Sequence, residues 1–398
     1  MPMPISNSPV AGSGFGEEEE AAILKPPRRL DRARAMRHLS VPRNQTQVWL
    51  ERCKAQQWLG DTGVIHLSET ERGIPLNALA PEDGDSFWEG FGTVDVEPNA
   101  RGPVHWRERL PPSLQELPES IWPSAYETQG DVLMLKLEDE ATPHAEAIAH
   151  AMLEHLPNVR VVCADAGVQG DFRVRDLQPI AWRGDDPTTR TQVREHGFSV
   201  LVDPSEVYYS SRLSHQRLGT LEALRSFRQQ LGRPLVVADP YAGVGPSLPL
   251  LLAEDELVNG YLAGDLNPKA VELLQQNLNV WTAKNHSNFE PATVVCQDAR
   301  TWKENSHLSK QADVVLVNLP HNSFEHLPDL FDLFSREGMG LLRGWAIVER
   351  ASVEALEQQL EGLVVDAGGL PSETNVSEIK GFSTTKCFVV FQTTVAWE

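Results

Sequence analysis

The sequence has few cysteines and no long apolar segment. Its four cysteines, Cys53, Cys163, Cys296 and Cys387, are far apart and form no C-x-x-C pair. The spacing indicates neither a zinc knuckle nor a disulfide framework, and we expect no metal site. No apolar run approaches the roughly 20 residues of a membrane-spanning helix, and the first residues lack a signal-peptide pattern. The sequence therefore predicts a cytoplasmic protein without membrane contact.

Positive charge is also scarce. The chain has 35 Lys and Arg residues against 56 Asp and Glu residues, a net charge of −21. Nucleic-acid-binding surfaces are usually basic, so this balance does not by itself favour such a partner. The segment from Lys25 to Lys54 is an exception, because its only acidic residues are Asp31 and Glu51. It fits an RNA contact or a solvated surface, and charge leaves both open.

The length of 398 residues predicts two or three domains, at about 100–200 residues each. Residues 1–34 combine Pro, Gly and charged residues without an apolar period, which is typical of a disordered tail. We expect a small N-terminal domain with its linker over residues 35–105 and an α+β middle domain over 106–205. Residues 206–398 are predicted to form a Rossmann-like α/β domain.

The first two folded domains are each predicted from short periodic segments. The N-terminal domain should contain a helix over Thr46–Trp58 and a Gly-, Asp- and Pro-rich linker over Pro81–Pro112. The middle domain should contain a helix over Pro143–Leu156. Phe198–Val202 is interpreted as the strand that closes the middle domain.

Strands and helices alternate from Leu235 onward, which predicts crossover connections and a largely parallel sheet. The expected strands are Leu235–Ala238, Gly260–Gly264, Thr293–Cys296, Asp313–Val317, Trp345–Val348 and Cys387–Thr393. The expected helices are Ser247–Ala253, Pro268–Asn279 and Val353–Leu360. In such sheets ligands bind at the carboxyl ends of the strands, beginning with the turn after the first strand.

That first turn reads Asp239-Pro-Tyr-Ala-Gly-Val-Gly-Pro246. Gly243 and Gly245 would allow a ligand to approach the backbone closely, although they fit a purely structural turn equally well. The complete G-x-G-x-x-G pattern is missing, because Leu248 stands where its third glycine belongs. This departure disfavours a dinucleotide-binding dehydrogenase.

Acidic residues end the second and third strands. Asp265 lies about 20 positions after Gly243, where a carboxylate can accept hydrogen bonds from ribose hydroxyls. The alternative for Asp265 is a helix cap before Asn267 and Pro268. Asp298 follows the third strand and could accept from an adenine amino group. The pattern predicts a nucleoside cofactor.

Together with four further segments, these motifs resemble the tRNA (guanine-N1)-methyltransferase family of archaea and eukaryotes, which modifies guanosine 37 beside the anticodon. The matching segments are Gly170-Asp-Phe-Arg173, Arg194-Glu-His-Gly197, Val207-Tyr-Tyr-Ser-Ser-Arg-Leu213, Asp239–Pro246, Asp265-Leu-Asn-Pro268 and Asn318-Leu-Pro320. The resemblance implies a class I methyltransferase fold, S-adenosylmethionine as cofactor, and tRNA as partner. It further implies contacts to the anticodon stem-loop and, through the N-terminal domain, to the outer corner of tRNA. We expect a monomer.

The resemblance also implies roles for individual residues. Arg173 would serve guanine O6, Tyr208 would lie near the target base, and Asn318 and Pro320 would hold the guanine edge. The alternatives are a surface ion pair for Arg173 and a core position for Tyr208. The implied cofactor-binding residues are Asp239, Tyr241, Gly243, Gly245, Asp265, Leu266, Asn267, Asp298, Ala299 and Asn318.

One position departs from the family pattern. Where the family has its general-base glutamate, this chain has Gln216, whose amide cannot serve as a base. The neighbouring His215 titrates near neutrality and is either a substitute base or a solvent-exposed histidine. Three outcomes remain open: another group or water takes the proton, the reaction is changed, or activity is lost. The alternatives are an aminocarboxypropyl transferase of the wybutosine pathway and a non-catalytic tRNA-binding homologue.

Overall fold

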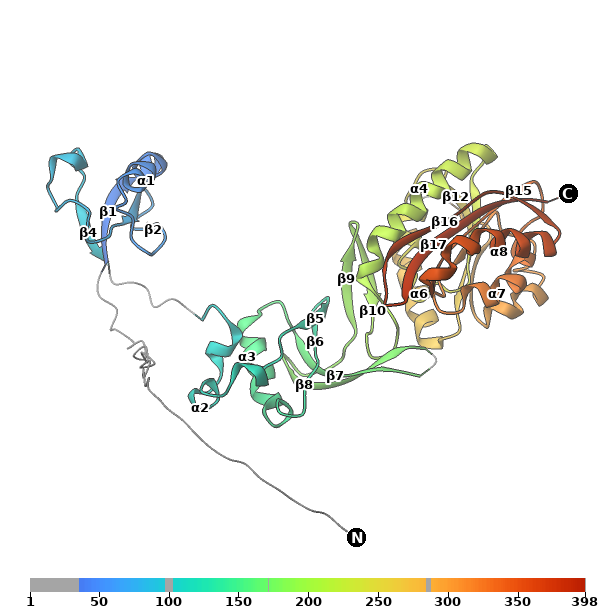
Figure 1. Ribbon diagram of the computed structural model, residues 1–398, viewed down its shortest axis with the longest axis horizontal. Helices are drawn as coiled ribbons and strands as arrows, with labels where there is room; N and C mark the ends of the chain where they lie inside the picture. The colour runs from blue at the N-terminus through green and yellow to red at the C-terminus, as the bar shows by residue number, and fades with distance from the viewer. Residues whose placement is uncertain (1–35, 97–102, 171, 284–287, 398) are drawn as a thin grey trace, which may run out of the picture. The chain divides into compact units, whose positions relative to one another are not determined.

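The computed structural model describes residues 36–96, 103–170, 172–283 and 288–397. The chain divides into two compact units, Met1–Gly102 and Pro103–Glu398 (Figure 1). The tail expected over residues 1–34 lies outside the described residues, as does the part of the basic segment before Met36. None of the described helices is both long and apolar enough to cross a membrane.

The first unit is a four-stranded antiparallel sheet packed against one helix. The strands lie in the order β2-β3-β1-β4. Their bounds are Met36–Pro42 (β1), Ile65–His66 (β2), Glu71–Pro75 (β3) and Thr93–Val96 (β4), and α1 spans Thr46–Ala55. The side chains of Trp49, Trp58 and Trp88 pack in one core.

The expected linker over Pro81–Pro112 is therefore wrong in its first part. Trp88, in a short 3-10 helix over Ser86–Trp88, is completely buried in the core of the first unit. Strand β4 pairs with β1 and completes the sheet. Burial of the large apolar side chain of Trp88 stabilises the fold, and the pairing of β4 with β1 satisfies backbone hydrogen-bonding groups. Both effects depend on distant partners, so the local Gly- and Asp-rich sequence does not indicate them.

The second unit begins with a small mixed sheet in the order β5-β6-β7-β8. Its strands are Tyr126–Gln129 (β5), Val132–Leu135 (β6), Val161–Gln169 (β7) and Val174–Trp182 (β8), preceded by a short α2 over Pro112–Gln115. Helix α3, Ala145–His155, connects the parallel strands β6 and β7 and buries Ile148 and Met152. The other pairs are antiparallel, which confirms the α+β expectation for this segment.

A hairpin of β9 (Thr191–Glu195) and β10 (Phe198–Val202) follows. Val200 and Val202 are buried in the core of the large sheet, and the Trp281 indole donates to the Ser199 carbonyl at 3.0 Å. The expectation that Phe198–Val202 closes the middle domain is therefore wrong, because its apolar side chains pack elsewhere. We propose to place the boundary of the catalytic domain before Thr191.

The large sheet has seven strands in the order β13-β12-β11-β14-β15-β17-β16. They are Leu235–Asp239 (β11), Val258–Asp265 (β12), Ala292–Cys296 (β13), Val314–Val317 (β14), Met339–Glu349 (β15), Gly369–Gly381 (β16) and Lys386–Trp397 (β17). The first five are parallel, whereas β17 runs antiparallel to both β15 and β16. The predicted doubly wound α/β fold is confirmed, with an antiparallel edge that the sequence pattern did not show.

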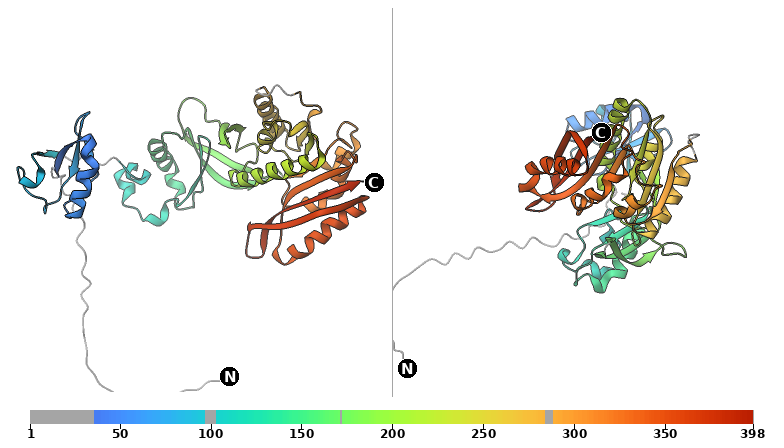
Figure 2. Two further views of the ribbon diagram at one scale, coloured as in Figure 1. Left: turned by 90° about the horizontal axis from the view of Figure 1, so that it is seen from above. Right: turned by 90° about the vertical axis from the view of Figure 1, so that its right-hand side faces the viewer.

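Helices cover both faces of this sheet (Figures 1 and 2). On one face lie α4 (Ser214–Leu231), α5 (Leu248–Leu252) and α6 (Pro268–Thr282), and on the other lie α7 (Ser323–Leu330) and α8 (Val353–Asp366). The chain winds outward through β12 and β13 and then crosses back to β14. The carboxyl ends of β11 and β14 therefore form a topological switch point, and in open α/β sheets ligands bind in the crevice at such a point.

Candidate functional site

Two polar side chains meet at the carboxyl edge of the large sheet. Asp239 is the last residue of β11, and Asn318 directly follows β14, the parallel neighbour of β11. The Asn318 Nδ2 atom donates to Asp239 Oδ1 at 3.1 Å and to Oδ2 at 3.3 Å. Since Nδ2 is committed to Asp239, the Oδ1 atom of Asn318 is left to accept a hydrogen bond from a ligand.

Asp239 lies in an enclosed position, with only 1% of its surface exposed. Burial raises the pKa of its carboxyl to about 7, and the nearby charge of Asp265 adds to this rise. Hydrogen bonds from the Tyr241 backbone and from Asn318 act in the opposite direction. Asp239 is therefore placed to orient Asn318 from the interior of the protein. Direct contact with the cofactor, the role that the resemblance implies, would require a carboxylate that is more exposed to solvent.

The turn after β11 depends on both glycines. Gly243 has φ +57° and donates its N–H to Asp265 Oδ2 at 2.9 Å. Gly245 has φ +81°, and a Cβ there would lie 2.5 Å from the Leu274 side chain on α6. A Cβ on Gly243 would instead lie 3.9 Å from the carbonyl oxygen of Tyr208. The turn thus passes directly beside the segment that carries Tyr208.

Asp265 and Asn267 shape the end of β12. Asp265 accepts from the backbone N–H groups of Gly243 and Asn267, and burial raises the pKa of its carboxyl. Asn267 caps α6 by accepting from the Lys269 N–H at 2.9 Å, and its Nδ2 donates to the Glu206 carbonyl at 2.8 Å. Asn267, and not Asp265, is therefore the helix cap. The neighbouring Leu266 is exposed and can contact a ligand through its side chain.

The third strand contributes Asp298, which precedes a 3-10 helix over Ala299–Glu304. Its carboxylate accepts from the Arg300 backbone N–H at 3.0 Å and forms an ion pair with the Arg300 guanidinium at 2.6 Å. These contacts, with the side-chain pair first, lower the pKa of Asp298. Asp298 is consequently ionised, and its carboxylate is partly engaged by Arg300. The adjacent Ala299 is buried.

Tyr241 lies between the turn and α7. Its hydroxyl is 2.8 Å from Nδ1 of His326, and burial raises the pKa of the phenol. Charges on Asp298 and Arg300 also reach Tyr241. The pair therefore links the β11 turn to α7.

The side chains of Arg173 and Tyr208 line one small hollow, together with Gln129, Val168, Arg175, Pro204, Val207 and Tyr209. Tyr208 is 54% exposed, so it is not a core aromatic; the neighbouring Tyr209, 5% exposed, takes that role. Arg173 is exposed and adopts φ +54° in the connection between β7 and β8. Among the residues that the structure describes, Arg173 has no ion-pair partner, and Asp171 of its motif lies outside them. The structure therefore brings Arg173 and Tyr208 together with free side-chain ends.

A buried network behind Tyr208 is absent from the sequence-based expectation. The Tyr209 hydroxyl donates to Glu195 at 2.6 Å, and the Arg217 guanidinium forms a buried ion pair with the same carboxylate at 2.7 Å. Arg217 also donates to the Ser210 carbonyl at 3.0 Å. The network joins β9, the Tyr208 segment and α4. Glu195 and Tyr209 lie inside two of the quoted motifs, which is the signal that could have found them, whereas Arg217 lies just after the second motif.

Gln216 and His215 lie in the first turn of α4. Gln216 is half-buried and His215 is exposed. Successive residues of a helix point about 100° apart, so the two side chains cannot occupy equivalent positions. His215 is therefore poorly placed to stand in for the residue at position 216. Pro320, in the loop after β14, accepts from the Ile347 N–H at 2.7 Å and fixes that loop.

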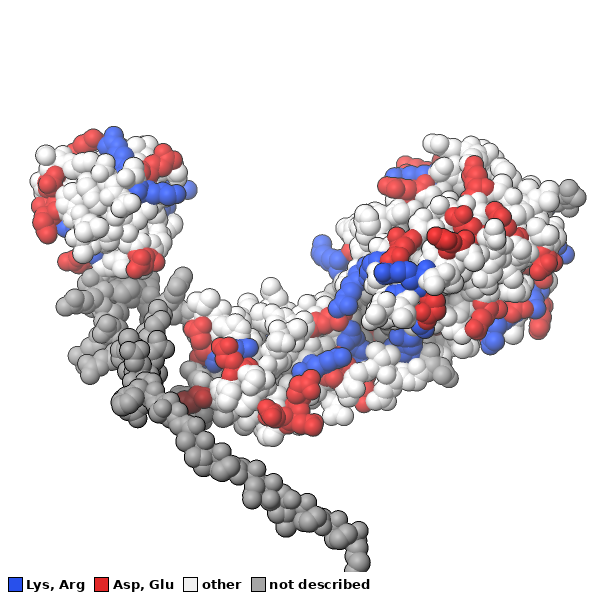
Figure 3. All heavy atoms as spheres, viewed as in Figure 1, with Lys and Arg blue, Asp and Glu red and all other residues white. Residues whose placement is uncertain are grey.

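Positive charge gathers locally despite the acidic composition. In Figure 3 the Lys and Arg side chains of the second unit cluster near hairpin β9–β10 and the adjacent end of the large sheet. The exposed cations of the second unit include Arg173, Arg194 on β9, Arg212, and Lys386 at the start of β17. The cluster provides a surface that can contact phosphates beside the crevice.

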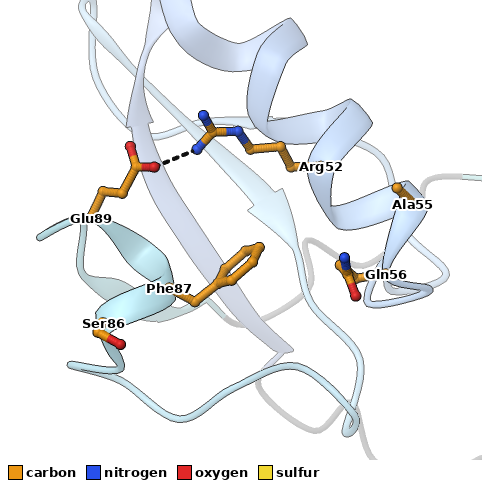
Figure 4. Close-up of a pocket in the computed structure, with 6 residues that line it drawn as sticks. All are labelled: Arg52, Ala55, Gln56, Ser86, Phe87 and Glu89. Atoms are coloured by element: carbon orange, nitrogen blue, oxygen red, sulfur yellow. Dashed lines mark hydrogen bonds and ion pairs between the residues drawn. The ribbon is translucent and has the colours of Figure 1, made fainter.

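A separate hollow lies in the first unit, between α1 and the 3-10 helix that carries Phe87 (Figure 4). Arg52 lines it, forms an ion pair with Glu89 at 2.8 Å and stacks over Trp49. Its charge is thereby largely neutralised, and the chemistry-bearing residues lie in the second unit.

Comparison with known proteins gives the family. Residues 107–187 match the TYW2 N-terminal domain, and residues 191–349 match the TRM5/TYW2 methyltransferase domain. The chain is 29% identical over 245 residues to tRNA (guanine(37)-N(1))-methyltransferase Trm5b of Pyrococcus abyssi, a match that covers 60% of this chain and 65% of that protein. It is 37% identical over 243 residues to tRNA (guanine(37)-N(1))-methyltransferase 2 of Phaeodactylum tricornutum, covering 56% and 39% respectively. The chain thus spans less than two thirds of the length of these relatives.

Solved structures agree in fold. The crystal structure of Pyrococcus abyssi Trm5b superimposes with a TM-score of 0.63 at 21% identity, covering 91% of this chain and all of that one. The complex of aTrm5 with tRNALeu gives 0.63 at 18% identity, covering 90% and 99%. These likenesses support the architecture described above. The matched domains, with the motifs in order along the chain, confirm the predicted resemblance: residues 191–349 match the TRM5/TYW2 methyltransferase domain.

Proposed function

We propose that this protein transfers a methyl group from S-adenosylmethionine to N1 of guanosine 37 in tRNA. The observation that carries the proposal is the proximity of the expected cofactor site to the expected site of the target base. The Gly243 turn passes beside the Tyr208 backbone, and Asn318 is held by Asp239 at the same sheet edge. A cofactor in the crevice and a base beside Tyr208 would therefore meet next to Asn318 Oδ1.

The residues present fit a nucleoside cofactor with a cationic sulfonium group. Asp265 and Asp298 end adjacent parallel strands and supply carboxylates for ribose hydroxyls and the adenine amino group. The positive φ of Gly243 and the exposed Leu266 leave room for a ligand beside the turn. When bound, the cofactor would supply an electrophilic methyl group. We expect Asp265→Ala to weaken its binding in calorimetry, whereas unchanged affinity would contradict the assignment.

On the substrate side, the chain must hold a guanine and balance its charge. Loss of the N1 proton places negative charge on O6, which the free guanidinium of Arg173 can stabilise. The Oδ1 atom of Asn318 can accept from the Watson–Crick edge of the base, and exposed Tyr208 can stack on its face. The local cluster of cations suits the phosphates of an anticodon stem-loop.

The relatives support tRNA as partner, since those compared are tRNA (guanine(37)-N(1))-methyltransferases and aTrm5 binds tRNALeu. We propose that the first unit contacts the outer corner of tRNA and that the protein acts as a monomer in the cytoplasm. Analytical ultracentrifugation with and without tRNA tests the oligomeric state.

The test of the reaction combines purified protein, labelled S-adenosylmethionine and two unmodified tRNAs, one with guanosine and one with adenosine at position 37. Nucleoside mass spectrometry should find 1-methylguanosine only in the first tRNA. Binding of both ligands without product would instead identify a non-catalytic homologue.

A second candidate is transfer of the aminocarboxypropyl group of the same cofactor. It is favoured by the match of residues 107–187 to the TYW2 N-terminal domain. The mass of the modified nucleoside separates the two reactions, and for this arm the tRNA must carry the wybutosine-pathway precursor base.

A further inference from the structure

The proposed methylation needs a group that accepts the N1 proton of guanine, and Gln216 cannot do this. The structure offers another titratable residue, three positions after Asn318. His321 directly follows Pro320, in the short loop between β14 and α7 that begins with Asn318. Its side chain is exposed on the described surface.

The backbone around His321 is held on both sides. The Pro320 carbonyl accepts from the Ile347 N–H at 2.7 Å. The Ser323 hydroxyl lies 2.7 Å from the Leu319 carbonyl and 2.6 Å from that of Trp345. These contacts fix the loop to β15, so the imidazole is presented from a defined position beside Asn318.

The surroundings of the imidazole come from two other elements. The ring lies edge-to-face with Phe382, with centroids 6.0 Å apart. The facing charges are Arg173, from the β7–β8 connection, and Lys386 at the start of β17; Lys386 is itself 3.7 Å from Glu349. Partial burial, then the charges of Arg173 and Lys386, lower the pKa of His321. The ring is therefore neutral at physiological pH and can accept a proton.

Arg173 connects this environment to the substrate. In guanine, N1 is bonded to C6, the carbon that carries O6. A cation that serves O6 and a base that serves N1 must consequently approach the ring from adjacent positions. Arg173 lines one hollow with Tyr208, whose carbonyl oxygen lies beside the Gly243 turn after β11, and His321 lies in the loop after the neighbouring strand β14.

We infer that His321 is the catalytic base of this enzyme, in place of the family's glutamate; the inference rests on the proposed function. An imidazole nitrogen takes the N1 proton, and the electron pair of the N1–H bond remains on the guanine ring, with charge on O6 beside Arg173. N1 then bonds to the methyl carbon while the carbon–sulfur bond breaks with its electrons on sulfur. The imidazolium returns its proton to solvent through its exposed edge.

Other titratable groups nearby are already engaged. His326 is bonded to Tyr241, and Asp239 is buried beneath Asn318 with both oxygens occupied. Glu195 holds Arg217 and Tyr209 in the buried network. His215 is exposed on α4 and serves as a matched control histidine.

The experiment measures single-turnover methylation of tRNA carrying guanosine 37 across pH. Wild type should lose rate as pH falls through the pKa of His321, because the protonated ring cannot act as a base. His321→Ala should cut the rate by about 10²–10⁴-fold, while His215→Ala stays within a few fold. In the Asp239→Asn background, which removes the carboxyl whose pKa is raised to about 7, His321→Ala should also abolish the acid limb. Gln216→Glu combined with His321→Ala should recover at least tenfold over His321→Ala alone, by restoring a carboxylate base.

Thermal melting and tRNA affinity of His321→Ala should match wild type, which separates lost chemistry from lost folding. If His321→Ala methylates within about threefold of wild type, or keeps the acid limb in the Asp239→Asn background, the assignment of His321 is wrong while the proposed function stands. If wild type makes no 1-methylguanosine at any pH, the proposed function fails and His321 falls with it.

Discussion

Asn318 and Asp239 form the polar pair at the centre of the site: the Asn318 amide nitrogen donates to both oxygens of a carboxylate that is almost completely buried. Above its pKa of about 7 the Asp239 carboxylate is ionised and can only accept, so it forces the amide to turn Oδ1 outward. The pair thus fixes which atom of Asn318 a guanine edge meets. Packing from β11 and β14 holds both residues in place.

Loss of either member of this pair should slow methylation by different amounts. Asn318→Ala removes a positioned group and should reduce the single-turnover rate by about 10²–10³-fold. Asp239→Asn keeps the shape of the side chain but no longer dictates the orientation of the Asn318 amide. It should reduce the single-turnover rate by about 10–100-fold, as the loss of a residue that orients another functional side chain typically does. Cofactor affinity by calorimetry should stay within a few fold for Asp239→Asn. A loss of cofactor binding as large as the loss of rate would instead make Asp239 a cofactor ligand.

Asp239 should also make stability depend on pH. Its folded-state pKa of about 7 exceeds the unfolded value of about 3.9, so ionising it in the fold is unfavourable. The resulting penalty is absent below about pH 4, grows as pH rises to about 7, and is constant above. Asp239→Asn cannot ionise, so its stability relative to wild type should be higher at pH 8 than at pH 4.5 by on the order of 2 kcal/mol. Melting curves at both pH values test this; an equal difference at the two would contradict a buried, raised carboxyl.

Arg173 should act on the transition state. Its guanidinium is exposed and without an ion-pair partner among the described residues, so removing it breaks no structural contact that they show. Arg173→Ala should reduce the single-turnover rate by about 10²–10³-fold with an unchanged melting temperature. Arg194→Ala, another exposed cation on the same surface, is the matched control and should weaken tRNA binding more than it slows the bound reaction. A rate within a few fold of wild type would remove Arg173 from the site.

The buried network should contribute mainly to stability. Arg217→Met leaves the Glu195 carboxylate buried without its cation, which typically costs about 3–5 kcal/mol. The exposed pair of Arg225 and Glu254 offers a control: Arg225→Ala should cost about 0–1 kcal/mol. Urea unfolding of both variants measures the difference. Replacing Glu195 and Arg217 together by apolar residues should restore part of the loss, and equal costs for Arg217→Met and Arg225→Ala would refute the network's importance.

The sequence by itself determined the catalytic fold and its ligand edge. Alternating apolar strands and helices after Leu235 specify a doubly wound sheet, and parallel strands necessarily bring their carboxyl ends to one edge. Asp265, Asp298 and Asn318 follow such strands, so their shared location could be read from local pattern. Local pattern failed where burial depends on distant partners. Trp88 lies among loop-forming residues but fills a core built by α1, and helix α4, whose sequence is largely polar, is held by one buried face.

Only the tertiary structure decided which of two adjacent residues faces the site. Tyr208 and Tyr209 are chemically alike, and the Glu195–Arg217 pair buries the second and leaves the first exposed. It likewise decided that Asp239 supports Asn318 from beneath. It also brought Phe382, from the connection between β16 and β17, edge-to-face with His321, from the loop after β14. Contacts of this kind depend on how whole strands and helices pack against one another. Because packing positions the elements that carry the two residues, the local sequence around each residue does not predict the contact.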